Sequence, residues 1–148
     1  MKYLFLLLSL LVLTVNSSFA TDLQSKIEEF PKKEMKSQNK TIVKMFISEM
    51  SKSLPQKIDK YTEFVKINAK DTTIFYTFEI NTGSKSDATV RKEDKTRMLN
   101  AVQAGICKSS MKFLEAGINI SYIYTSAISK ANLFQFDVTQ EDCIKIDN

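Results

Sequence analysis

The stretch Ile74–Ile80, which reads Ile-Phe-Tyr-Thr-Phe-Glu-Ile, decides the fold of this chain. Large apolar residues occupy every second position, and such alternation is typical of a β-strand with one buried face. A weaker alternation precedes it at residues 64–69, and Lys70-Asp71-Thr72 between them fits a short turn. Two strands so close in sequence predict a β-hairpin.

A second hairpin is predicted further along, where residues 118–125 and 133–138 alternate in the same way. Apolar residues at helical spacing separate the two hairpins, from about Thr89 to Ala116, and they also precede the first hairpin, up to Ser53. The order of elements is therefore α(α)-ββ-α-ββ. We expect an α+β fold in which four strands form an antiparallel sheet of two hairpins, with helices on one face.

The first residues have the parts of a secretory signal peptide. Lys2 supplies a positive charge, an apolar run extends from Tyr3 to Leu13, and Ser18 and Ala20 are small residues that fit cleavage after Ala20. The run is shorter than the roughly 20 residues that span a membrane. We therefore predict an exported protein, periplasmic or secreted, without stable membrane insertion after cleavage.

The chain is accordingly divided into three segments. After a signal peptide (1–20), an N-terminal helical segment (21–60) and a ββαββ body (61–148) form one domain, which is long enough to bury a core of its own. The formal net charge of the whole chain is +4, and the excess of Lys lies in residues 21–60. These Lys residues either form a solvated helix face or attract an anionic surface or an acidic partner.

Export decides how the two cysteines, Cys107 and Cys143, are interpreted. In an oxidising compartment, an even pair favours a disulfide, and the alternative is two buried thiols. The bridge would close a loop of about 36 residues and stabilise the fold by about 4 kcal/mol in the chain-entropy model. It would join the end of the central helix to the end of the last strand.

Several kinds of chemistry are excluded by composition. The chain has no His, which removes the commonest general base and most zinc sites, and its three Gly cannot form a phosphate-binding loop. Neighbouring carboxylates such as Glu93-Asp94 point apart on a helix and fit surface charges. No nucleic-acid-binding motif occurs. We therefore expect a protein that is not an enzyme and has no metal, cofactor or nucleic-acid partner.

Strict alternation divides the strand residues between two faces. The apolar set, which includes Ile67, Tyr76, Tyr122 and Phe136, is expected to be the core. The opposite face carries four large apolar residues among polar ones, and a clustered apolar patch with a polar rim suggests a binding surface. Scattered singly, or covered by the N-terminal helix, the same residues would need no functional explanation. The candidate surface comprises Phe64, Lys66, Phe75, Thr77, Ser121, Ile123, Leu133 and Gln135.

The second half of the chain resembles a group of small bacterial exported proteins that have one C-terminal disulfide and no assigned activity. The resemblance implies a periplasmic, disulfide-closed α+β domain, and it implies no site residues. It rests on the segment Leu54–Asp59 together with Asn100, Cys107, Leu114, Gly117, Tyr122, Tyr124, Phe136, Asp142 and Cys143.

The sequence leads to a non-enzymatic binding protein of the bacterial envelope as the first functional hypothesis. Such a protein would be an inhibitor, an immunity-type protein or an assembly factor, and its partner would be another protein or an envelope component. The alternatives are a carrier of a small ligand, an envelope hydrolase, or a secreted effector directed at host cells. The sequence does not determine the oligomeric state. It also does not determine whether the open sheet face or the basic N-terminal helices are used for binding.

Overall fold

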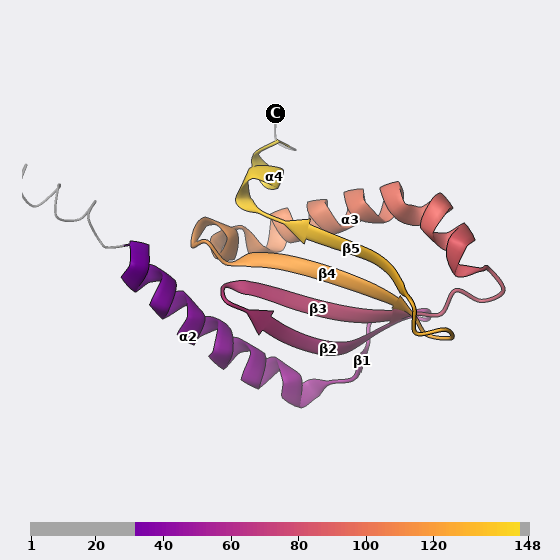
Figure 1. Ribbon diagram of the computed structural model, residues 1–148, viewed down its shortest axis with the longest axis horizontal. Helices are drawn as coiled ribbons and strands as arrows, with labels where there is room; N and C mark the ends of the chain where they lie inside the picture. Colours follow the sequence, from indigo (N-terminus) through magenta and orange to yellow (C-terminus); the bar gives the residue numbers. More distant parts are fainter. Residues whose placement is uncertain (1–31, 146–148) are drawn as a thin grey trace, which may run out of the picture. The chain divides into compact units, whose positions relative to one another are not determined.

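The computed structural model describes residues 32–145, so the predicted signal peptide and the start of the N-terminal helical segment lie outside the described residues. No helix within 32–145 is long and apolar enough to span a membrane. The elements, several of which are labelled in Figure 1, are α2 (Lys32–Met50), η1 (Ser51–Ser53), β1 (Gln56–Lys57), β2 (Thr62–Lys70), β3 (Thr73–Ile80), α3 (Asp87–Glu115), β4 (Asn119–Ser126), β5 (Asn132–Val138) and α4 (Gln140–Ile144).

The strands form one five-stranded sheet in the order β1-β2-β3-β4-β5. Both predicted hairpins are present, β2 with β3 and β4 with β5, and the α+β class is confirmed. The prediction of a four-stranded antiparallel sheet is wrong in two respects. The two-residue strand β1 adds to the edge of β2, and β3 pairs with β4 in parallel.

The parallel pair follows from the length of α3, which has 29 residues. A helix of this length carries the chain back along the sheet, as a crossover between neighbouring parallel strands requires. As a result β4 starts beside the start of β3, with Thr73 opposite Asn119. Figure 1 shows α3 passing back along β4 and β5, the two strands that it contacts most.

Two β-bulges change the faces on which residues lie. The pairing of β2 with β3 shifts between Phe64 and Lys66, and that of β4 with β5 shifts at Tyr124/Thr125, opposite Leu133. A bulge inserts an extra residue and therefore interrupts the alternation of side chains. Phe64 and Leu133, which strict alternation places on the open face, are each only 4% exposed and belong to the hydrophobic core.

The helices pack through residues at the spacing that their sequences predict. On α2 the buried residue is Val43, while Ile42 is half exposed. Helix α3 begins earlier than predicted, because the Ser86 hydroxyl accepts a hydrogen bond from the Thr89 amide and caps it. It then continues through a kink at Ser110. The core residues of α3 are Val90, Val102, Ile106 and Leu114.

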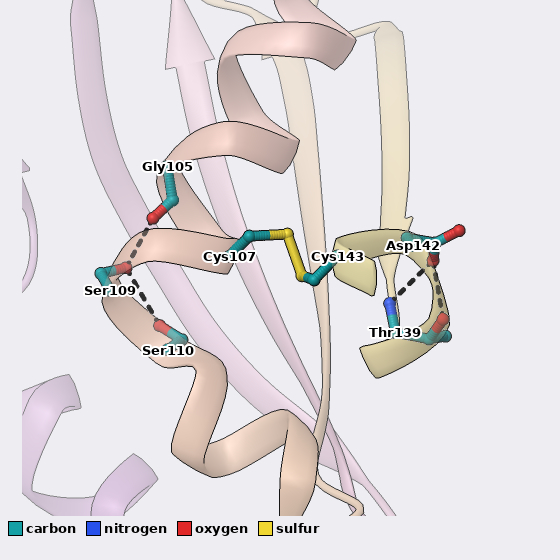
Figure 2. Close-up of a disulfide and its surroundings, with 7 residues drawn as sticks. All are labelled: Gly105, Cys107, Ser109, Ser110, Thr139, Asp142 and Cys143. Carbon is teal, nitrogen blue, oxygen red and sulfur yellow. Dashed lines mark hydrogen bonds between the residues drawn. A yellow bond between two sulfur atoms is a disulfide. The ribbon is translucent and has the colours of Figure 1, made fainter. Parts of the chain in front are cut away.

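The predicted disulfide joins Cys107 of α3 to Cys143 of α4, with the two Cα atoms 5.3 Å apart. Figure 2 shows the bond crossing from one helix to the other. Cys143 is completely buried. At the start of α4, the carboxylate of Asp142 accepts hydrogen bonds from the Thr139 amide (2.9 Å) and the Thr139 hydroxyl (2.7 Å). The last strand is thus held to α3 through a capped helix and a covalent bond.

Replacing Asp142 by Asn should destabilise the protein by about 1 kcal/mol at neutral pH, as loss of a capping interaction does. The Thr139 hydroxyl and amide donate to the carboxylate and lower the pKa of Asp142 below its ordinary value of 3.8. Because this pKa is depressed in the folded state, the stabilisation is present above 3.8 and is lost as the pH falls through the folded-state pKa. Urea unfolding of both proteins across this range should show the difference shrinking at acid pH; a constant difference would contradict the account.

Candidate functional site

The structure gathers most of the sequence-predicted surface on the face opposite the core. Lys66, Thr77, Ile123 and Gln135 stand opposite one another on four adjacent strands and form one row. Phe75 and Ser121 are partners in the next row, which continues to Asn68 and Asp137. Only Phe64 and Leu133 are missing from this face, because the two bulges turn them into the core.

This open face offers little apolar surface. Its two remaining large apolar residues, Phe75 and Ile123, are half-buried by their neighbours, while Lys66 and Gln135 are exposed. Ser121 is fully buried between them, and its hydroxyl oxygen has no hydrogen-bond partner. Shielded apolar residues in a mainly polar row do not make an extended hydrophobic patch. The face is therefore a weaker candidate than its sequence pattern suggests.

The opposite face carries a continuous band of aromatic rings across β2, β3 and β4. Phe78 lies at its centre, with ring centroids 5.1 Å from Phe64, 5.0 Å from Tyr122 and 5.2 Å from Tyr124. Tyr76 continues the band, 5.1 Å from Tyr122. Aromatic pairs at this separation stabilise each other beyond the burial of their area. We call Tyr76, Phe78, Tyr122 and Tyr124 the aromatic band.

Helix α3 leaves part of this band uncovered. A groove of about 210 Å³ lies between the helix and β4, and it is lined by Ala101, Val102, Gly105 and Ile106 on one side and by Tyr122 and Tyr124 on the other. We call it the tyrosine groove. Gly105 is exposed, and a Cβ atom added there would meet nothing within 4 Å. The missing side chain therefore keeps the wall of the groove open.

The tyrosines of the band combine apolar surface with an unused polar group. Burial raises the pKa of Tyr76 and of Tyr124 to about 12, and it also raises the pKa of Tyr122, so the phenols stay neutral at physiological pH. Their hydroxyls make no hydrogen bond to another residue of the described chain, and they are not fully enclosed. An amphipathic aromatic surface with free hydroxyls is typical of binding interfaces.

Replacing Gly105 by Ala should stabilise the protein by roughly 0.5–1 kcal/mol, since Gly inside a helix is less favourable than Ala by this amount. The added methyl group meets no neighbouring atom, so no strain offsets the gain. Thermal unfolding of the two proteins measures the difference. A lower unfolding temperature for the variant would mean that the space beside Gly105 is not open.

Alternation places Tyr76, Tyr122 and Tyr124 in the core. Tyr124 is indeed buried there, at 8% exposed, but Tyr76 and Tyr122 are only partly buried, and this partial exposure was not expected. One signal could have indicated it. Three phenols on adjacent central strands are unlike the aliphatic residues that fill a closed core, because buried hydroxyls need partners. The Lys-rich N-terminal region offers a different feature, as α2 exposes Ile42 and, more strongly, Met45, which is 69% exposed. Within residues 32–145, no group of three or more His, Cys, Asp or Glu could hold a metal ion.

No protein-family model matches the chain, and no curated protein matches its sequence. Solved structures do match it. A protein of Pseudomonas aeruginosa described as secreted gives a TM-score of 0.64 at 10% identity. The type 2 secretion system pilotins EpsS from Vibrio vulnificus and AspS from Vibrio cholerae give TM-scores of 0.63 and 0.60, both at 17% identity. Each match covers 74% of this chain and 96% of the other.

The chain has the fold of these pilotins. The neighbours are described as a secreted protein and as secretion-system pilotins, which agrees with the predicted export and with a small envelope protein. They do not distinguish the periplasm from the medium.

Proposed function

We propose that this chain is an exported binding protein of the bacterial envelope that helps to assemble a larger complex. In this proposal the tyrosine groove holds an apolar segment of a partner protein. The observation that carries it is the partly exposed aromatic band beside Gly105, where α3 has no side chain to cover the tyrosines. The pilotin fold supports an assembly role, by analogy with the type 2 secretion systems to which those neighbours belong.

The size of the tyrosine groove favours a protein segment over a small ligand. Its volume of about 210 Å³ is below the roughly 300–1,000 Å³ that is usual for pockets enclosing a small molecule. An apolar side chain or two from a partner would fit this space and cover the tyrosine rings, while the phenol hydroxyls would bond to polar atoms of the partner. We therefore place the small-ligand carrier second.

Filling the groove tests the proposal without disturbing the core. In Gly105→Trp the indole would occupy the groove, while Ala104→Trp places the same residue on an exposed neighbouring position of α3 that does not line it. Each tagged protein, expressed in a strain lacking the original gene, is purified from crosslinked envelopes and its partners are identified by mass spectrometry. We expect one envelope protein to be captured by the original chain and by Ala104→Trp, but at least about tenfold less by Gly105→Trp.

Equal capture by the two Trp variants would contradict the groove as the site. The assembly role itself would be contradicted if the original protein captured no specific partner and if deletion of its gene left secretion and envelope integrity unchanged. Circular dichroism and thermal unfolding of each variant establish that it is folded. Fractionation of the same cells distinguishes a periplasmic protein from one released to the medium, as a host-directed effector would be.

A further inference from the structure

A second groove lies on the other side of α3, between the first half of the helix and the strand β5. Its volume is about 520 Å³. Three cationic side chains, Arg91, Lys92 and Lys95, line it from the helix, and apolar residues of β5, Leu133, Phe134 and Phe136, line it from the sheet. We call it the basic groove. It shares no lining residue with the tyrosine groove.

The strand that borders the basic groove is an open edge. Among the strands of residues 32–145, β5 is the last of the sheet and pairs with β4 alone. An edge strand presents unpaired amide and carbonyl groups, which form a template for a further strand. One of these groups is already in use, since the Arg91 guanidinium donates a hydrogen bond of 2.8 Å to the Asn132 carbonyl. The Arg91 guanidinium thus reaches the backbone of the edge strand.

Within residues 32–145, no acidic side chain balances the charge of the basic groove. Among the described residues, Arg91, Lys92 and Lys95 form no ion pair, whereas Lys85 and Arg97 on either side pair with Glu93 and Asp94. None of the described carboxylates lines the groove. Clustered cations attract an acidic partner and repel a basic one.

We propose that an extended acidic segment of a partner protein adds to β5 as a sixth strand. Its backbone would pair with the edge of β5, and its carboxylates, on the face of the new strand that is turned towards α3, would lie beside the three cations. A second copy of this chain is the less suitable occupant, because pairing β5 with β5 would bring two sets of these cations together. The inference goes beyond the proposed function, since it concerns a separate surface.

The probe is a synthetic peptide as long as β5, seven residues, in which glutamate alternates with valine. Binding to the mature protein is measured by calorimetry. We expect the charge reversals Lys92→Glu and Lys95→Glu together to weaken binding about tenfold or more. The matched control, Lys108→Glu with Lys112→Glu, reverses two exposed charges near the other end of the same helix and should change affinity less than about twofold.

Backbone pairing is tested with two further peptides, each N-methylated at alternate residues. One should lose binding, because its methyl groups face β5, and the other should keep it. The proposal would be overturned if both methylated peptides bound, if the unmethylated probe did not bind, or if the two pairs of charge reversals had equal effects. It would also be overturned if sedimentation showed a dimer that the Lys92→Glu and Lys95→Glu reversals abolish. The Gly105→Trp variant should bind the peptide normally, because position 105 lies outside the basic groove. The proposals for the tyrosine groove and for the basic groove can therefore fail independently of each other.

Discussion

The protein in which Cys107 and Cys143 are both replaced by Ala should unfold with a free energy about 4 kcal/mol lower than that of the oxidised protein. The bond joins residues 36 apart in sequence, and a loop of this length gives that value in the chain-entropy model. Ala is preferred to Ser because Cys143 is completely buried and a hydroxyl there would lack a partner. Urea denaturation at equilibrium measures the loss.

Reduction provides the internal control for this prediction. A reducing agent should lower the stability of the original protein by a similar amount and leave the double variant unchanged. A loss below about 1 kcal/mol would contradict the view that the bond carries a large part of the stability, because the whole domain is expected to have only about 5–15 kcal/mol. The end of β5 and α4 should become the first region to exchange amide protons.

Replacing Phe78 by Ala should cost about 3–5 kcal/mol, the usual effect of removing a buried Phe side chain. Phe78 is 8% exposed and contacts Phe64, Tyr122 and Tyr124 at the centre of the aromatic band. Its matched control is Phe75→Ala on the same strand, because this ring points to the opposite face and is half-buried. We expect the control to lose less than about 1.5 kcal/mol.

The comparison of these two Phe variants, by urea denaturation, identifies the face that forms the core. Equal losses would mean that both faces of the sheet are equally packed, which would contradict the burial pattern of β3. The Phe78 variant should also loosen the rings of Tyr122 and Tyr124, since it removes their common neighbour. Near-ultraviolet circular dichroism detects the changed surroundings of these tyrosines.

Local patterns predicted the hairpins and helices well, because alternation and helical spacing act within each element. The pairing of β3 with β4 was not predictable in this way, since it depends on how α3 returns across the sheet. The bulges at Val65 and Leu133 were equally hidden. No residue type marks them, yet each reverses the face of its neighbours, and together they removed Phe64 and Leu133 from the surface that alternation predicted.

The two grooves could not be predicted from the sequence for a related reason. Each lies between α3 and a strand, so its lining residues come together only when the helix has packed on the sheet. Residue types still indicate what each groove suits. Gly105 and two tyrosines give an open aromatic site, while Arg91, Lys92 and Lys95 give a cationic one. The disulfide, by contrast, followed from export and the number of cysteines alone.

Photocrosslinking in living cells tests the central claim most directly. A photoreactive phenylalanine analogue is placed at position 104, the exposed neighbour of Gly105 beside the tyrosine groove, and in a second strain at position 77 on the open sheet face. Illumination should link one envelope protein to position 104 and not to position 77. A crosslink to that protein from position 77 alone would contradict the tyrosine groove as the binding site, as would the absence of any specific crosslink from position 104 in a folded protein.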